Sequence, residues 1–482
     1  MYDTCGRPLA GARERFRYRM FSHPDVPFVR GFDLDPVAFW RSLAGCARAA
    51  LGALPAGCRI RGVAATSQRE ACVLLDAADE VLYAGPNLDA RATLEGFEVH
   101  QAFGVRRLHA TTGHLPACVF PLARYLWFRK HGDAARVASV LMLSDWITER
   151  LSGARVAEPS NAAESMLFDV TRRTWSEEIC AAFDVPAGIL PALHPSGTRV
   201  GAVHARAAAD TGIPEGTPVF TGGADTQCAL LGSGAVAPGD TAAIVGTTCP
   251  VQMVTQAAVL DPAANLWTSC HVVADRWVLE SNAGETGGAY RWLLKLLFGA
   301  ADAAAHAAAE PLAAAAAREV LCYLGPIVFD LRKMNPFRPG GVLFRFPIVH
   351  VDRPERGDVL RGFLESVAFA VRANGEQIAA VAGRPVQALK ASGGMVASPT
   401  LVQLLADTLG VPVEVATVPE TASLGCAILL AAGAGLHPSL GDAVAAMTAH
   451  ARVEPRAQAA RTAEERYRRW RELYATLEQC TM

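Results

Sequence analysis

An aspartate that follows a pair of glycines has a sequence context suited to catalysis. The apolar residues 218–220 predict a short buried strand, which the glycines interrupt, and Asp225 comes just before small residues typical of a helix. Glycines at such a place let the backbone approach a ligand closely. Ligands of open α/β sheets bind where strands end, so we expect the Asp225 carboxylate to face a ligand. The alternative is that Asp225 only caps the following helix through backbone N–H groups.

Two polar clusters earlier in the chain contain the residue types that bind hydroxyl groups. Arg69 and Glu70 follow a predicted strand over 59–66, and a second cluster places Asp89 beside Arg91. The forked donors of arginine and the acceptor oxygens of carboxylates suit a polyhydroxylated ligand. Either cluster alone would also be explained by an ion pair on the surface.

Two glycine turns in the second half of the chain suit a nucleotide. Residues 241–248 predict a strand that ends in a Gly-Thr-Thr turn, whose backbone N–H groups and hydroxyls favour phosphate. Residues 389–410 repeat the plan of 218–235, which is a strand, a Gly-Gly turn and a helix, here beginning at Pro399. Two copies of one plan, far apart in the chain, predict two related lobes with a cleft between them.

Regular elements must position these groups. The spacing of apolar residues predicts helices over 32–54, 119–131, 135–151, 284–296, 300–319, 360–381 and 455–479. Further strands are predicted over 72–75, 200–203 and 412–415. Residues 1–20 are typical of the second half of a β-hairpin, with turn residues from Asp3 to Gly6.

Composition limits the class of protein. A length of 482 residues predicts two or three domains, and 45 Lys+Arg against 47 Asp+Glu gives no electrostatic support for nucleic-acid binding. The 12 cysteines lack metal-binding spacing and predict free thiols in a reducing compartment. No apolar run reaches spanning length and no secretory leader pattern is present, so we expect a cytoplasmic protein without a membrane partner.

The order of the motifs resembles the FGGY family of carbohydrate kinases. The segments QRE, DAR, SDWITERLSG, GGAD, GTT, SGGMVASP and ETASLG keep their order over nearly the whole chain. The stretches around QRE and SDW are most similar to the autoinducer-2 kinase branch. The resemblance implies an α/β fold of two actin-like (ASKHA, ribonuclease H-like) lobes with a central cleft. Residues 1–238 would bind the substrate, and residues 239–482 would bind the nucleotide.

The resemblance also implies a reaction. An ATP- and Mg²⁺-dependent kinase would phosphorylate a hydroxyl of a small sugar-like molecule, first of the autoinducer-2 (dihydroxypentanedione) type, with xylulose, glycerol or another polyol as the alternative. Asp225 matches the catalytic base. The residues matched to substrate are Arg69, Glu70, Asp89 and Thr226, and those matched to nucleotide are Gly246, Thr247, Thr248, Gly393, Gly394 and Ser398. No residue is matched to a metal, and a homodimer is expected because dimers are usual among relatives.

The chain departs from the family at its beginning. The family opens with a strand and a phosphate-binding hairpin of the form Asp-x-Gly-Thr-x-x-x-Arg, and here Met1 falls in the second strand of that hairpin. A central strand of the N-terminal sheet would then be missing, and its neighbours would lose backbone hydrogen bonds. We favour a reading frame that was started too late, because the other site motifs are intact. A true truncation would instead make the protein a degenerate, non-catalytic sugar-binding protein.

Overall fold

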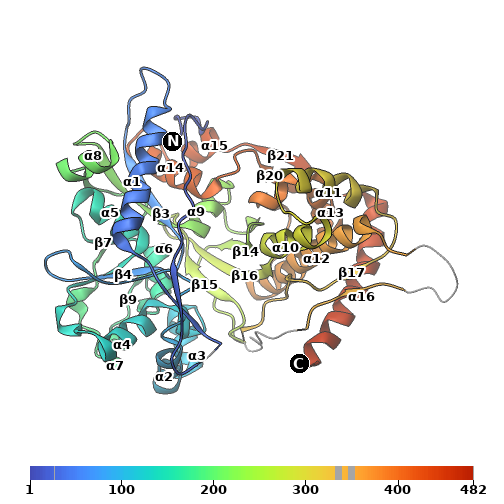
Figure 1. Ribbon diagram of the computed structural model, residues 1–482, viewed down its shortest axis with the longest axis horizontal. Coiled ribbons are helices and arrows are strands. Elements are labelled where there is room, and N and C mark those ends of the chain that lie inside the picture. Colours follow the sequence, from blue (N-terminus) through green and yellow to red (C-terminus); the bar gives the residue numbers. More distant parts are fainter. Residues whose placement is uncertain (27, 332–338, 346–352, 481–482) are drawn as a thin grey trace. The chain divides into compact units, whose positions relative to one another are not determined.

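The structure is a computed structural model that describes residues 1–26, 28–331, 339–345 and 353–480 (Figure 1). The chain divides into two compact units that are each assembled from three stretches. Unit 1 comprises Met1–Val236, Gln256–Val278 and Glu420–Thr448, and unit 2 comprises Ala237–Thr255, Leu279–Pro419 and Ala449–Met482. Both units combine sheets with helices, so the predicted α/β class is confirmed. The domain boundary expected between 238 and 239 stays a prediction.

One sheet of unit 1 carries the first chemical motifs at its edge. It has the order β11-β12-β3, with β11 Arg199–Ala202, β12 Pro218–Ala224 and β3 Val63–Ser67. β12 is parallel to β3, and Ala224 lies opposite Ser67. Because parallel strands end at the same edge of a sheet, the residues after β3 and those after β12 are brought side by side. Residues 68–70 follow β3, and helix α9 (Asp225–Gly232) follows β12 directly.

A second sheet of unit 1 corrects one predicted helix. It has the order β5-β4-β6, with β4 (Cys72–Leu75) buried in the middle, β5 at Val81–Gly85 and β6 at Ser139–Met142. The helix predicted over 135–151 is therefore wrong in its first half, and α5 begins only at Leu143. The four residues of β6 are all buried and pair antiparallel with β4. A short apolar run of this kind has no periodicity that separates a buried strand from a helix.

Helices cover these sheets. Both α5 (Leu143–Ser152) and α14 (Thr421–Gly433) pack against β3 and β12. The apolar core next to α1 (Pro36–Gly52) includes Trp40, Trp146 and Val219. The other helices of unit 1 are α2 Thr93–Phe103, α3 Val105–Thr112, α4 Pro121–His131, α6 Pro159–Ala162, α7 Glu177–Ala182, α8 Ala205–Thr211 and α15 Leu440–Met447. Its other strands are β1 Arg19–Ser22, β2 Arg30–Asp33, β7 Val156–Ala157, β8 Phe168–Asp169, β9 Thr174–Trp175, β10 Ala192–Leu193 and β15 Trp267–Cys270.

Helix α9 is held against α14 by two glycines. A Cβ atom on Gly232 would lie 2.0 Å from the carbonyl oxygen of Thr421, and one on Gly425 would lie 1.9 Å from that of Cys228. Such contacts leave no room for a side chain, so the two backbones touch. The helix that begins with Asp225 is thereby fixed within unit 1.

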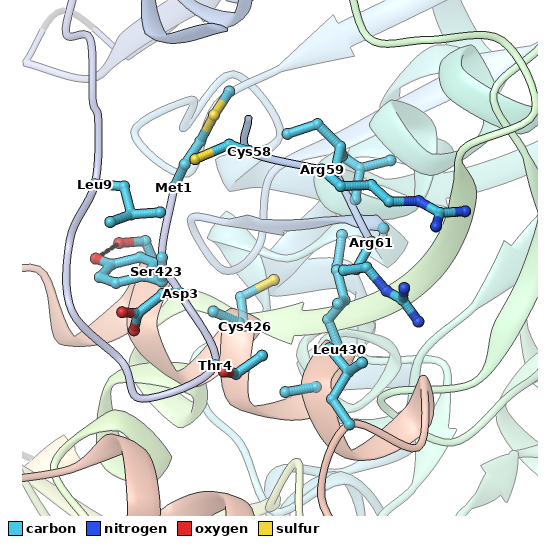
Figure 2. A pocket seen from close by; sticks show the side chains of 18 of the residues that line it. Met1, Asp3, Thr4, Leu9, Cys58, Arg59, Arg61, Ser423, Cys426 and Leu430 are labelled. Carbon is cyan, nitrogen blue, oxygen red and sulfur yellow. Dashed lines mark hydrogen bonds between the residues drawn. The ribbon is translucent and has the colours of Figure 1, made fainter. Parts of the chain in front are cut away.

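The N-terminal segment borders a cavity in unit 1. The Asp3 carboxylate accepts hydrogen bonds from Cys5 N and Arg7 N, both at 2.9 Å, which confirms the predicted turn. A cavity of about 520 Å³ lies against β3 and is lined by the N-terminal segment, by residues 58–64 and by α14. Figure 2 shows Met1, Cys426 and Leu430 around it. Among the described residues β3 has one strand partner, β12. The missing first strand stays a prediction.

Unit 2 has a larger sheet of the order β16-β14-β13-β19-β20-β21. The strands are β13 Thr241–Ile244, β14 Thr248–Thr255, β16 Trp277–Glu285, β19 Leu389–Ser392, β20 Val413–Ala416 and β21 His450–Val453, with β17 Leu321–Cys322 and β18 Val342–Leu343 pairing separately. The helices are α10 Gly287–Phe298, α11 Ala303–Ala315, α12 Arg356–Ala382, α13 Pro399–Leu409 and α16 Ala457–Gln479. These helices confirm the ones predicted from the sequence. None of the described helices combines the length and apolar character that crossing a bilayer requires.

Candidate functional site

Five ionisable residues of unit 1 form one polar cluster, which we call the Asp225 cluster. They are Arg69, Glu70, His114, Glu164 and Asp225, and they come from four separate parts of the chain. Arg69 is its centre: Nη1 lies 3.7 Å from Glu164 Oε1, and Nε lies 4.0 Å from Glu70 Oε1. The parallel pairing of β3 and β12 places Asp225 near Arg69.

Asp225 is the first residue of α9, and within the described part of the chain only one of its carboxylate oxygens accepts hydrogen bonds. Its Oδ1 accepts hydrogen bonds from Thr226 N at 2.7 Å and from Thr226 Oγ1 at 3.1 Å. No group in the described residues donates to Oδ2, and no side chain caps α9, whose cap position is Ala224. Burial raises the pKa of Asp225, and the nearby Arg69 opposes this rise. The geometry thus favours a half-buried carboxylate that can accept a proton over a helix cap.

The backbone before Asp225 is anchored from a neighbouring helix. Ala224 N donates to Ser160 Oγ at 2.9 Å, and the Ser160 hydroxyl in turn donates to the buried Glu158 carboxylate. A Cβ atom on Gly223 would lie 2.4 Å from Val272 Cγ1, so a larger residue at this position would displace the Val272 side chain. These contacts fix where the α9 N-terminus, and with it Asp225, stands.

Arg69 and Glu70 lie in a tight turn at the end of β3. Ala71 N donates to Arg69 O at 2.7 Å, and Glu70 between them has a left-handed φ of +58°. The Arg69 guanidinium lies 5.3 Å from the ring centroid of Trp267. Burial raises the pKa of Glu70 to about 8, with Arg69 opposing the rise and the Glu164 and Asp225 carboxylates adding to it. A neutral Glu70 near pH 7 can both donate and accept hydrogen bonds.

Glu164 and His114 are members of the cluster that the sequence reasoning missed. Both are fully buried, and His114 Nε2 lies 3.3 Å from Glu164 Oε2. Glu164 Oε1 also accepts a hydrogen bond from Ser269 Oγ at 2.9 Å. Burial alone would raise the pKa of Glu164, but His114 and Arg69 hold it at about 2. Neither residue has a spacing signal, because each is recruited by folding alone.

The Glu164 carboxylate favours the protonated form of His114. Its Nδ1 lies 2.8 Å from the carbonyl oxygen of Thr112, so Nδ1 holds a proton and donates it there. Nε2 then faces a carboxylate, which favours a second proton. Burial lowers the pKa of His114, but the Glu164 carboxylate outweighs this and the net shift is upward. The ionised Glu164 thus lies between the Arg69 guanidinium and an imidazole whose pKa it raises.

Asp89 and Thr226, the other predicted substrate ligands, have local partners. The fully buried Asp89 carboxylate accepts hydrogen bonds from Phe32 N, Tyr83 Oη and both Arg91 N and Nε. These donors occupy its oxygens, which favours a structural role, and its contact with substrate stays a prediction. Thr226 adjoins the cluster through its two hydrogen bonds to Asp225.

The predicted nucleotide residues gather in unit 2 at the ends of two parallel strands. β13 and β19 pair with Ile244 opposite Ser392, so the Gly-Thr-Thr and Gly-Gly turns leave the sheet at one edge. Gly393 has a φ of +97°, and a Cβ atom there would lie 2.6 Å from Val245 O. Thr247 and Thr248 are exposed, so their hydroxyls face outward.

Each glycine turn adjoins the start of a helix: the Gly-Thr-Thr turn adjoins α10, and the Gly-Gly turn precedes α13, which Ser398 caps. Gly246 O accepts hydrogen bonds from Gly287 N at 2.9 Å and from Thr286 Oγ1 at 3.0 Å, which ties the Gly-Thr-Thr turn to the α10 N-terminus. The N-terminal end of a helix favours phosphate. Gly394 opens the short turn after Gly393, and a Cβ atom there would meet nothing within 4 Å. Ser398 caps α13 and donates to Glu310 Oε2 at 2.6 Å, so its hydroxyl already has a partner.

The described residues contain no group of three or more His, Cys, Asp or Glu side chains arranged to hold a metal ion.

Comparisons with known proteins place these features in context. The N-terminal domain of the FGGY family of carbohydrate kinases matches residues 30–232, and its C-terminal domain matches residues 241–434. An autoinducer-2 kinase of Yersinia enterocolitica is 31% identical over 457 residues, covering 91% of this chain and 84% of the relative. An autoinducer-2 kinase of Salmonella typhimurium is 30% identical over 459 residues, covering 92% and 85%.

Solved structures with the same fold include two sugar or polyol kinases. A xylulose kinase from Rhodospirillum rubrum is 27% identical, with a TM-score of 0.81 over 95% of this chain and 92% of the other. The glycerol kinase of Plasmodium falciparum with ADP gives a TM-score of 0.84 over 100% and 96%, and at 18% identity this is a likeness of fold alone.

Proposed function

Because the chain belongs to the FGGY family of carbohydrate kinases, we propose that it transfers the γ-phosphoryl group of Mg²⁺-ATP to a hydroxyl of dihydroxypentanedione, the linear form of autoinducer-2. Family membership makes the protein a phosphotransferase with an alcohol group as acceptor. What we propose beyond this class is the identity of the acceptor. The observation that carries it is an identity of about 30% to autoinducer-2 kinases over nine-tenths of the chain.

In this proposal Asp225 is the catalytic base. Its Oδ2, to which no described residue donates, accepts the proton of the acceptor hydroxyl as that oxygen attacks the γ-phosphorus, and the bond from phosphorus to the ADP oxygen breaks. Thr226 holds Oδ1, so the carboxylate has one fixed orientation. Phosphoryl transfer depends mostly on positioning and on charge neutralisation, so a single oriented carboxylate is sufficient base chemistry.

Arg69 and Glu70 then bind the acceptor. Dihydroxypentanedione presents two adjacent carbonyl oxygens and two hydroxyls. The forked guanidinium of Arg69 suits adjacent oxygens, and Glu70, whose pKa burial raises to about 8, can donate to one oxygen and accept from another. Glu164 lies beside the Arg69 guanidinium and positions it, and His114 in turn lies beside Glu164.

The turns of unit 2 bind the nucleotide in the same proposal. Gly246, Thr247 and Thr248 offer N–H groups and exposed hydroxyls to phosphate, while Gly393 and Gly394 let the adenosine lie against the backbone. Mg²⁺ arrives with ATP. All twelve cysteines are free thiols, which supports a cytoplasmic setting.

A panel of acceptors tests the proposal. Purified protein with Mg²⁺-ATP is offered dihydroxypentanedione, xylulose and glycerol, and ADP release is measured for each, with Asp225→Asn as the blank. We expect the highest kcat/KM for dihydroxypentanedione. A higher value for xylulose or glycerol would contradict the acceptor but keep the kinase.

The alternative from another class is a non-catalytic sugar-binding protein. Thermal unfolding with each ligand separates the two functions. Stabilisation by an acceptor without any response to Mg²⁺-ATP, together with no ADP release, would support the binding protein. Stabilisation by both ligands supports the kinase.

A further inference from the structure

We infer that Arg124 is a positioning residue of the acceptor site, which fixes the backbone turn that aims Arg69 and Glu70. This inference rests on the proposed function, in which those two side chains bind the acceptor. Arg124 lies in α4, far along the chain from the turn, and nothing in its sequence context indicates such a role.

The turn is the part of the site that most needs an external support. Glu70 has a φ of +58°, a conformation that residues with side chains adopt rarely, and the bond from Ala71 N to Arg69 O closes the turn around it. Such γ-turns are uncommon, and outlying backbone conformations persist only where their surroundings impose them. Because Arg69 and Glu70 are consecutive, a change of φ at Glu70 redirects both side chains at once.

Arg124 supplies that support from inside the protein. Its side chain has no exposed surface, and Nη1 donates to the carbonyl oxygen of Glu70 at 2.7 Å. The same guanidinium donates through Nε to Asp89 O at 3.1 Å and through Nη2 to Asn87 O at 3.4 Å. A buried cation thus joins the strained turn to the 87–89 segment through three backbone carbonyls. Only the planar fork of arginine reaches all three.

The same helix offers a matched control. Arg129, five residues further along α4, donates through Nη1 to the carbonyl oxygen of Phe183 at 2.6 Å. Replacing Arg129 with methionine removes one guanidinium-to-carbonyl hydrogen bond from α4, and replacing Arg124 removes three; both changes keep much of the apolar stem. Only the Arg124 contact ends on the turn of the acceptor site.

The experiment compares Arg124→Met, Arg124→Lys and Arg129→Met with the wild type. For each protein we measure the KM for the acceptor that the panel identifies, the KM for Mg²⁺-ATP, kcat, the dissociation constant for the acceptor by calorimetry, and the melting temperature. We expect Arg124→Met to raise the acceptor KM and dissociation constant about ten- to a hundredfold, while the KM for Mg²⁺-ATP stays within about twofold. For Arg124→Lys the acceptor KM and dissociation constant should lie between those of the wild type and those of Arg124→Met, because an ammonium group reaches fewer carbonyls.

Several outcomes would overturn the inference. They are an unchanged acceptor KM in a folded Arg124→Met, an equal rise of both KM values, and an equal rise of the acceptor KM in Arg129→Met. If Arg124→Met does not fold, the same comparison of the two KM values in Arg124→Lys decides. If neither variant folds, Arg124 serves stability alone and the inference is overturned. A wild type that neither binds nor phosphorylates any acceptor would refute the proposed function itself. A wild type that binds without turnover still tests Arg124 through the dissociation constants.

Discussion

Replacing Asp225 with asparagine separates a catalytic base from a structural carboxylate. Asparagine keeps an Oδ1 atom that can accept the two hydrogen bonds from Thr226, so the start of α9 should be preserved. What is lost is the negative charge and the free oxygen that accepts a proton. A negative charge in the first turn of a helix contributes at most about 2 kcal/mol in a partly buried position, so the free energy of unfolding should change by no more than that.

The effect of Asp225→Asn on the catalytic rate should be far larger than its effect on stability. General-base catalysis contributes roughly 10²- to 10⁴-fold, which corresponds to about 2.7–5.4 kcal/mol of transition-state stabilisation. We expect kcat to fall by such a factor, with KM values within about threefold of the wild type. Burial raises the pKa of Asp225, so the wild-type kcat should decline on the acid side at a pH above the usual 3.8 of an aspartate. That decline should be absent from the residual activity of Asp225→Asn.

The assay is ADP release at saturating acceptor and ATP over a range of pH, with a thermal melt of each protein. Asp35→Asn is the matched control, because Asp35 caps α1 through Val37 N and Ala38 N and asparagine caps equally well. It should leave kcat unchanged. A kcat of Asp225→Asn within tenfold of the wild type, or an identical loss in Asp35→Asn, would refute the assignment of the base.

Three further predictions concern the cluster and the packing of α9. Between pH 4.5 and about 8 the folded protein retains a proton on Glu70 that the unfolded chain has released. The contribution of Glu70 to the free energy of unfolding therefore falls as the pH rises through this range. The melting temperature of Glu70→Gln should decline less than that of the wild type between these two pH values. Glu164→Gln removes the carboxylate that faces the buried His114 and should lower the free energy of unfolding by about 1–3 kcal/mol, measured by urea unfolding at neutral pH; an unchanged value would show that the pair adds nothing. Gly425→Ala should destabilise the protein by about 1–3 kcal/mol or more, because the added Cβ has no room. Gly45→Ala in α1, where a Cβ would meet nothing within 4 Å, should stabilise the protein by up to about 1 kcal/mol. Equal melting temperatures for the two variants would contradict the packing argument.

Much of the fold was predictable because its signals are local. The strand before Asp225, the glycines that interrupt it and the helix after it follow from neighbouring residues, and β12 and α9 have that form. The strand at 139–142 was not predictable, because its three apolar residues, 140–142, continue the pattern of the following helix as well as they form a strand. Only the pairing with β4 in the middle of the sheet distinguishes the two.

The sequence by itself determined the order of the motifs, the strand-turn-helix units and the place of Asp225 at the start of a helix, since each depends on residues a few positions apart. Tertiary structure alone decided that Glu164 and His114 surround Arg69, and that Arg124 holds the turn at Glu70. The physical reason is that a buried charge is stable only beside partners that compensate it, and in a folded chain those partners come from distant segments whose spacing carries no signal.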